Sequence, residues 1–337
     1  MNHRVYDESH IQQLISTDDF AEASKYLFEL QCNDWKLCRD NYEQLENVQI
    51  KKFLFDAFSI KAQFNPGRIV STSAKVDPKS IQQRKCFLCE ENLPAEQKGI
   101  LYKDEYIILI NPFPIFPIHF TLTNIKHQPQ RIADSFPYLL DLSKDLSKYF
   151  TVIYNGPRCG ASAPDHLHFQ AGNKFFMPID DEADLIANEF GSDVIQNDNL
   201  IIQTVDDGLR KFLLIESKER KLLIQAFDSF YETYSDLMNE NQEPLMNIIS
   251  FCDSEFGWRI IVFLREKHRS HHYFEEGENQ ILVSPAAIDL GGVCIFPKEK
   301  DFEKINKDLI REIFTEVFID KSKLDKLNSR LKKIFKR

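Results

Sequence analysis

The sequence contains no long uninterrupted apolar run. Its most apolar window, residues 106–120, is broken by one asparagine and three prolines, whereas a membrane-spanning helix needs about 20 consecutive apolar residues. The first residues carry charges and no apolar segment of the kind found in a signal peptide. We therefore expect a cytoplasmic protein that does not span or bind a membrane.

Positive charge and paired cysteines are also scarce. The net charge is −10, from 42 Lys and Arg against 52 Asp and Glu, which disfavours general nucleic-acid binding. An anionic substrate would therefore need basic residues gathered locally. The seven cysteines are odd in number and mostly isolated, so a disulfide framework is not expected. The exception is Cys86 and Cys89, which have the spacing of metal ligands.

Apolar residues make up 43% of the 337 residues, which is enough for a sizeable core. Apolar residues at helical spacing predict a helical segment within residues 1–60. Strand-like runs with intervening helical patterns then follow twice, and we assign one set to residues 61–215 and the other to residues 216–320. The pattern predicts an α+β fold with two related halves, each an antiparallel sheet carrying a helix.

The last segment, residues 321–337, carries eight basic residues and one acidic residue. Leu324, Leu327 and Leu331 fall on one face of a helix there. A basic amphipathic helix of this kind can bind a membrane or a nucleic acid, or it can dock on an acidic body. We favour docking and expect no nucleic-acid partner.

Residues 155–172 read NGPRCGASAPDHLHFQAG and carry the pattern most indicative of chemistry. If residues 165–171 form a strand, His166, His168 and Gln170 lie on one face and the two intervening residues face the core. A neutral imidazole whose second nitrogen is bonded to a carbonyl presents an unprotonated nitrogen that can attack phosphorus.

The turn before this strand supplies groups suited to a phosphate. Backbone N–H groups in the glycine-rich stretch and the hydroxyl of Ser162 can hold phosphoryl oxygens, and Gln170 can donate a further hydrogen bond. The alternative is that both histidines are half-buried polar residues or metal ligands. The combination of turn, histidines and glutamine favours catalysis.

The motif resembles the signature of the histidine-triad superfamily. The matching residues are Asn155, Gly156, Gly160, Ser162, His166, His168 and Gln170. The branch it resembles contains galactose-1-phosphate uridylyltransferase, diadenosine tetraphosphate phosphorylase and GDP-L-galactose phosphorylase, and DHLHFQA is most similar to the last of these. Residues 64–75, 111–127 and 281–305 extend the resemblance.

The resemblance implies a histidine-triad-like sheet and a double displacement. His168 would attack the α-phosphorus of a nucleotide sugar, with GDP-hexose as the first guess, and phosphate or a sugar phosphate would accept the nucleotidyl group. Gln170 and Ser162 would hold phosphoryl oxygens. Alternatives are a dinucleoside polyphosphate phosphorylase or hydrolase, and a non-catalytic nucleotide-binding protein. A homodimer is an open alternative to a monomer.

The resemblance also implies a structural zinc site and a set of substrate contacts. The zinc ligands would be Cys86, Cys89, His166 and His127, with His119 as the alternative to His127. An anionic substrate needs cations: Arg68 lies in the 64–75 loop, which resembles a nucleotide-holding loop, Arg158 lies inside the glycine-rich turn, and a second basic cluster spans residues 265–272. The substrate-binding candidates are Asn65, Arg68, Asn155, Gly156, Arg158, Gly160, Arg265 and Lys267.

Overall fold

The computed structural model describes residues 5–6, 9–73, 77–239 and 242–336. The chain begins with three helices, α1 (Ser9–Ser16), α2 (Phe20–Asp34) and α3 (Lys36–Gln44). The helical segment ends earlier than predicted, because β1 (Gln49–Leu54) and β2 (Ser59–Phe64) form an antiparallel pair. Residues 58–64 alternate apolar and polar side chains with a period of two, which is the signal that favours a strand.

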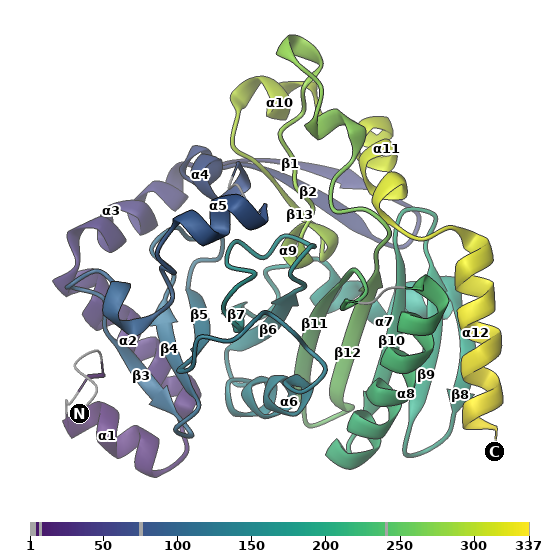
Figure 1. Cartoon of the computed structure of the whole chain (residues 1–337), viewed down its shortest axis with the longest axis horizontal. Helices are drawn as coiled ribbons and strands as arrows, with labels where there is room; N and C mark the ends of the chain where they lie inside the picture. Colours follow the sequence, from purple (N-terminus) through teal and green to yellow (C-terminus); the bar gives the residue numbers. More distant parts are fainter. Residues whose placement is uncertain (1–4, 7–8, 74–76, 240–241, 337) are drawn as a thin grey trace.

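The main sheet has ten strands, all paired antiparallel, in the order β3-β4-β5-β7-β6-β11-β12-β10-β9-β8. Figure 1 shows them in this order from left to right. The strands are β3 (Gly99–Tyr102), β4 (Tyr106–Ile110), β5 (His119–Asn124), β6 (Phe150–Asn155), β7 (His168–Asn173), β8 (Gly191–Gln196), β9 (Ile201–Asp206), β10 (Lys211–Ser217), β11 (Met246–Asp253) and β12 (Gly257–Leu264).

The sheet is an internal duplication. Each half has three consecutive strands, then a helix, then two strands of which the last inserts beside the third. The helices are α6 (Phe136–Asp145) and α8 (Arg220–Met238), and the halves meet where β6 pairs with β11. The prediction of two related halves in an α+β fold is confirmed. The sheet topology puts their division between β7 and β8, whereas the sequence assigned residues up to 215 to the first half.

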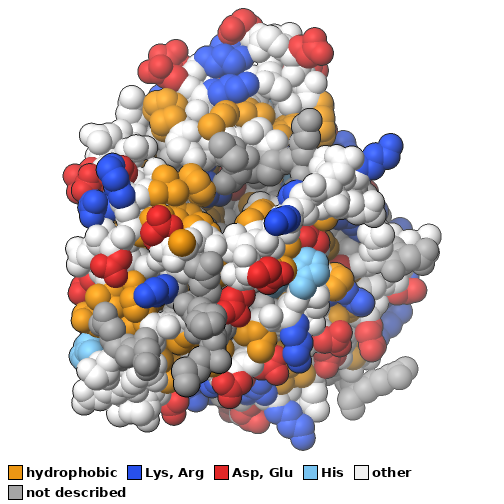
Figure 2. All heavy atoms as spheres, turned by 60° about the vertical axis from the view of Figure 1, so that its left-hand side comes forward, with side chains coloured by type: hydrophobic (Ala, Val, Ile, Leu, Met, Phe, Trp, Pro, Cys, Tyr) orange, Lys and Arg blue, Asp and Glu red, His pale blue; other side chains and the backbone are white. Residues whose placement is uncertain are grey.

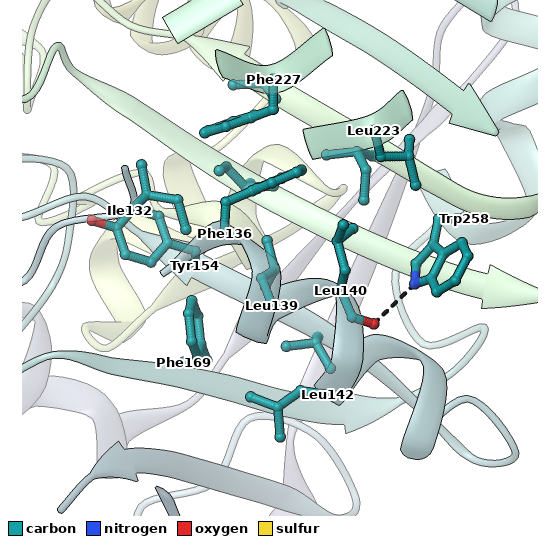
Figure 3. Close-up of a cluster of buried hydrophobic side chains, with 14 of the residues drawn as sticks. Ile132, Phe136, Leu139, Leu140, Leu142, Tyr154, Phe169, Leu223, Phe227 and Trp258 are labelled. Atoms are coloured by element: carbon teal, nitrogen blue, oxygen red, sulfur yellow. Dashed lines mark hydrogen bonds between the residues drawn. The ribbon is translucent and has the colours of Figure 1, made fainter. Parts of the chain in front are cut away.

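One face of the sheet carries the larger core. It is covered by α1, α2, α6, α8 and α12 (Lys321–Phe335). Figure 3 shows Phe136 of α6 against Phe227 of α8, with the ring centroids 3.8 Å apart, and Trp258 donating a hydrogen bond to the Leu140 carbonyl. Burying each large apolar side chain here contributes about 1.5–3 kcal/mol.

The opposite face is covered by α7 (Ile179–Phe190), α9 (Ala287–Leu290), α10 (Glu299–Lys304), α11 (Lys307–Val317) and a small sheet. That sheet joins β1 and β2 to β13 (Val293–Phe296), which pairs parallel with β2. The C-terminal segment therefore folds back over the face that β7 presents away from the larger core. This arrangement encloses the candidate site.

The basic terminal helix packs against the body of the molecule. Leu324, Leu327 and Leu331 are buried, and Arg330 pairs with Asp236 of α8 at 2.5 Å. This is the docked arrangement that its pattern favoured. Within the described residues, no helix combines the length and apolarity needed to cross a bilayer.

Candidate active site

Strand β7 begins at His168, three residues later than the predicted start at residue 165, so His166 lies outside the strand. Leu167 and Phe169 enter the larger core as expected, so His168 and Gln170 point to the opposite face. His166 precedes the strand, and its ring approaches Cys86 instead of standing beside His168. The idea that all three motif side chains line one strand face is therefore corrected to a pair, His168 and Gln170.

The ring of His168 is held in one tautomer. Its Nδ1 lies 2.8 Å from the backbone carbonyl oxygen of His166, which can only accept, so Nδ1 carries the proton and Nε2 does not. Gln130 fixes the backbone by accepting from the His168 N–H at 2.8 Å and donating to its carbonyl at 3.0 Å. Burial lowers the pKa of His168 to about 4, so the imidazole is neutral at neutral pH.

The amide of Gln170 is oriented by His119 of the neighbouring strand. His119 Nδ1 accepts from the Ile115 N–H at 3.3 Å, so its proton is on Nε2, which donates to Gln170 Oε1 at 2.9 Å. Burial, reinforced by the nearby Arg68 charge, lowers the pKa of His119 to about 3. With the carbonyl end engaged, the NH₂ end of Gln170 is available to donate. His119 is therefore a partner of Gln170 and does not join the cysteine cluster as its alternative ligand.

A cavity of about 80 Å³ lies beside these residues. Its walls come from segments far apart in the sequence: the glycine-rich turn, β7, the Arg68 loop and the segment after β12. His168 is not among the lining residues and is 3% exposed, two positions before Gln170 on the same strand face. The lining residues are Arg68, Thr72, Ile115, Asn155, Gly160, Ala161, Ser162, Gln170, His268, Arg269, Ser284, Ala286, Ile288, Asp289 and Ile295.

The glycine-rich turn is packed tightly against the C-terminal segment. Gly160 has φ 97°, and a Cβ added there would lie 2.7 Å from Ala286 Cβ. A Cβ at Gly156 would lie 2.7 Å from the Met246 carbonyl oxygen. Asn155 Oδ1 accepts from Ala287 N at 2.9 Å and from Asn247 Nδ2 at 2.8 Å. Asn155 therefore ties the end of β6 to both the second half and the cavity wall.

The predicted substrate contacts divide into two groups. Arg68, Asn155 and Gly160 line the cavity. The other five predicted residues bond to the protein itself. Asn65 donates to the Pro114 carbonyl, Arg158 donates to the Glu243 carbonyl, and the Gly156 N–H donates to the Met246 carbonyl. Arg265 donates to carbonyls that include those of Lys267 and His268, and Lys267 pairs with Glu316.

Two basic-cluster residues that the sequence reasoning passed over do reach the cavity, namely His268 and Arg269. Arg265 is fully buried and binds the carbonyls of residues 267 and 268, which shapes the loop that carries them. The basic cluster at residues 265–272 was visible in the sequence. The contacts of the buried Arg265 guanidinium decide which members of that cluster face the cavity. Acidic and basic side chains are interspersed over the face shown in Figure 2.

The predicted metal ligands converge on one point. The ligand atoms of Cys86, Cys89, His127 and His166 all lie within 4.8 Å of one another. His166 Nδ1 is 3.3 Å from Cys86 Sγ and 3.4 Å from His127 Nδ1. A tetrahedral zinc with ordinary bond lengths separates its ligand atoms by roughly 3.3–3.8 Å, so this set fits Zn²⁺. His166 Nε2 bonds the Asn124 carbonyl at 2.8 Å, which leaves Nδ1 unprotonated and able to bind a metal.

Two family models match the chain. Residues 27–173 match the model described as Domain of unknown function (DUF4922), and residues 193–337 match the model described as GDPGP1-like, C-terminal domain. No curated protein matches the chain by sequence.

Solved structures share the fold. The yeast Ap4A phosphorylase Apa2 in complex with AMP is 15% identical with a TM-score of 0.55, over 84% of this chain and 95% of that chain. The same enzyme in complex with Ap4A is 16% identical with a TM-score of 0.53, over 85% of this chain and 97% of that chain.

The chain therefore shares the overall fold of the yeast Ap4A phosphorylase over most of both chains. Its second half, residues 193–337, is similar to the GDPGP1-like C-terminal domain.

Proposed function

We propose that the protein is a nucleotidyl-transferring phosphorylase that works through a covalent nucleotidyl-His168 intermediate. The observation that carries the proposal is the hydrogen bond from His168 Nδ1 to the His166 carbonyl, because it leaves Nε2 with an unprotonated lone pair. Gln170 lies two residues further along the same face, roughly 7 Å away, and its NH₂ group faces the cavity where a phosphoryl group would bind.

In the first step, His168 Nε2 attacks the α-phosphorus of the donor. The N–P bond forms as the P–O bond to the leaving phosphate breaks, and the imidazole gains a positive charge. That charge is stabilised by the Nδ1–H bond to the His166 carbonyl. Gln170 and the Ser162 hydroxyl hold the non-bridging oxygens. In the second step, a phosphate oxygen attacks the same phosphorus, the N–P bond breaks, and its electron pair returns to Nε2.

The donor is a nucleoside diphosphate sugar or a dinucleoside polyphosphate. The GDPGP1-like domain match supports the first, with GDP-hexose as the leading candidate. The yeast enzyme, whose structures hold AMP and Ap4A, supports the second equally. Both donors have an α-phosphoryl group linked to a leaving phosphate, and this is the group that His168 would attack.

Zn²⁺ at Cys86, Cys89, His127 and His166 has a structural role in this proposal. Bound there, the metal would crosslink the 86–89 loop to the residue whose carbonyl orients His168. Its contribution would be to position the nucleophile, with no contact to the substrate.

Intact-mass spectrometry tests the covalent step. The protein is incubated with a panel of nucleoside diphosphate sugars and Ap4A, without phosphate, and a mass gain of one nucleoside monophosphate is expected with the true donor. The matched control is His168→Asn, because the asparagine amide can still donate to the His166 carbonyl but has no nucleophilic nitrogen. No adduct and no phosphate-dependent turnover with any donor, while wild type and His168→Asn bind nucleotide alike, would instead favour a non-catalytic binding protein. Phosphate-independent turnover would favour a hydrolase.

A further inference from the structure

Arg269, His268 and Ser284 form a polar wall of the cavity that the nucleotidyl-transfer steps leave without a role. Arg269 Nε donates to Ser284 Oγ at 2.9 Å, and its guanidinium lies over the Tyr273 ring, 3.9 Å from the ring centroid. Tyr273 is itself anchored by its hydroxyl, which donates to the Thr72 carbonyl at 3.2 Å. The stacking and the bond to Ser284 fix the guanidinium plane before any ligand arrives.

The guanidinium groups of this cavity are not neutralised by ion pairs. Among the described residues, no carboxylate lies within 4.0 Å of a side-chain nitrogen of Arg269 or Arg68, since neither arginine takes part in a salt bridge there. The carboxylate in the wall, Asp289, accepts backbone N–H groups from Ala286 and Ile295, both at 2.9 Å. Arg68 already donates to the Phe113 carbonyl at 2.5 Å and Asp289 already accepts two backbone N–H groups, so the guanidinium that the cavity offers to an anion is that of Arg269.

The cavity, of about 80 Å³, has room for several water molecules and can therefore take a phosphate group. The Ser284 hydroxyl accepts from Arg269 and also lies 3.4 Å from His268 Nε2, and Arg269 retains its terminal N–H groups for a bidentate contact.

We propose that Arg269 and Ser284 form the subsite for the phosphate group that is bonded to the α-phosphate of the donor. This phosphate leaves with the rest of the donor, and the acceptor phosphate then takes its place. This inference rests on the proposed function. In the double displacement, the acceptor enters the position that the leaving phosphate vacates, so one subsite serves both. The incoming HPO₄²⁻ attacks the phosphorus of nucleotidyl-His168, the P–O–P bond forms, the N–P bond breaks, and the product is a nucleoside diphosphate that keeps the phosphate proton until it exchanges with solvent.

The first test is independent of catalysis. Binding of inorganic phosphate to the full-length protein is measured by isothermal titration calorimetry at constant ionic strength. Arg269→Gln is expected to weaken binding about 10-fold or more, because a charge-assisted bidentate contact is lost. The matched control is Arg311→Gln, since Arg311 is exposed on α11 and pairs with Asp308 outside the cavity. Equal phosphate affinity in Arg269→Gln and wild type, or equal weakening in Arg311→Gln, overturns the proposal.

The second test separates the subsite from the overall function. Nucleotidyl-enzyme is isolated, and its breakdown is followed against the concentration of inorganic phosphate or of a hexose 1-phosphate. Arg269→Gln is expected to shift the half-saturating concentration upward by about 10-fold or more, and Arg269→Lys is expected to recover part of the loss. An unchanged phosphate dependence overturns the subsite. If wild type forms no adduct, the proposed function fails, and the calorimetric comparison still decides whether Arg269 binds phosphate. Thermal unfolding of each variant establishes that it is folded.

Discussion

His119 Nε2 donates a hydrogen bond to Gln170 Oε1 at 2.9 Å, from the strand that pairs with β7. An amide side chain can present either its oxygen or its NH₂ group, and this bond decides which end faces the cavity. His119 is in turn fixed by the Ile115 N–H on its other nitrogen. The orientation of the motif glutamine is therefore set by a histidine about fifty residues earlier in the chain, which acts as a positioning residue.

Replacing His119 tests this relationship. In His119→Leu the amide of Gln170 loses its orienting donor, and kcat is expected to fall by about 10- to 100-fold with a smaller change in KM, because small misplacements of a group at the reacting centre have effects of this size. His119→Gln keeps an N–H group near the position of Nε2, and it should retain more activity than the leucine variant. Steady-state kinetics of the two variants make the comparison. Equal losses in both would show that the bond to Gln170 is not what matters.

Removal of the metal ligands gives a second prediction. Purified protein is expected to contain about one zinc per chain, and Cys86→Ser and Cys89→Ser should each lower the zinc content and the Tm, because a structural zinc contributes directly to folding. Metal content is measured by plasma mass spectrometry. Cys32→Ser is the control, since Cys32 lies near Cys38 and away from the cluster. Zinc-free wild-type protein with the same Tm as zinc-loaded protein would contradict the assignment.

Much of the candidate site follows from local sequence patterns. A period of two predicts that His168 and Gln170 share a strand face, and the resemblance selects the ligand set Cys86, Cys89, His127 and His166, whose atoms do converge. These features depend on spacing within a strand or on a motif. The late start of β7 at His168 was not predicted, because nothing in DHLHFQA itself marks where pairing with the neighbouring strands begins.

The cavity wall formed by the C-terminal segment could not be predicted. Whether Arg269 or Arg265 faces the cavity depends on how the segment after β12 folds back, and that is fixed by long-range contacts. Asn155 bonds the Ala287 N–H across 132 residues, and Gly160 packs on Ala286. No local pattern encodes such contacts. The arginine chosen from the basic cluster is instead buried on backbone carbonyls.

Gly160 provides a third prediction, about stability. Gly160→Ala would place a Cβ 2.7 Å from Ala286 Cβ in a residue whose φ is 97°, so strain and a steric clash add. We expect a loss of about 2–4 kcal/mol in the free energy of unfolding, measured with urea. Gly208→Ala is the matched control, because Gly208 also has a positive φ, 79°, but nothing lies within 4 Å of its added Cβ. A loss that is no larger for Gly160→Ala than for Gly208→Ala would show that contact with the C-terminal segment is not tight.

The last prediction concerns the buried carboxyl of Glu243, which accepts from the Tyr154 hydroxyl and the Ile132 N–H, both at 2.6 Å. Burial raises the pKa of Glu243 to about 7, although both hydrogen bonds and the charges of Arg131 and Arg158 act in the opposite direction. The pKa is thus higher in the folded than in the unfolded chain, whose value is 4.5. The protonated form favours folding, so this contribution to stability is fully present below pH 4.5 and is lost as the pH rises to about 7.

Glu243→Gln mimics the protonated carboxyl, since its amide can donate to the Tyr154 oxygen while its carbonyl accepts from the Ile132 N–H. The difference in unfolding free energy between the variant and wild type should therefore increase in favour of the variant from pH 5 to pH 8, by about 2–3 kcal/mol. Urea unfolding at a series of pH values measures it. Glu255, an exposed acidic residue at a turn, provides the control substitution to Gln, which should leave the pH dependence of wild type unchanged. A parallel pair of stability profiles for wild type and Glu243→Gln would mean that the carboxyl titrates at its ordinary pKa and that water reaches it in the folded protein.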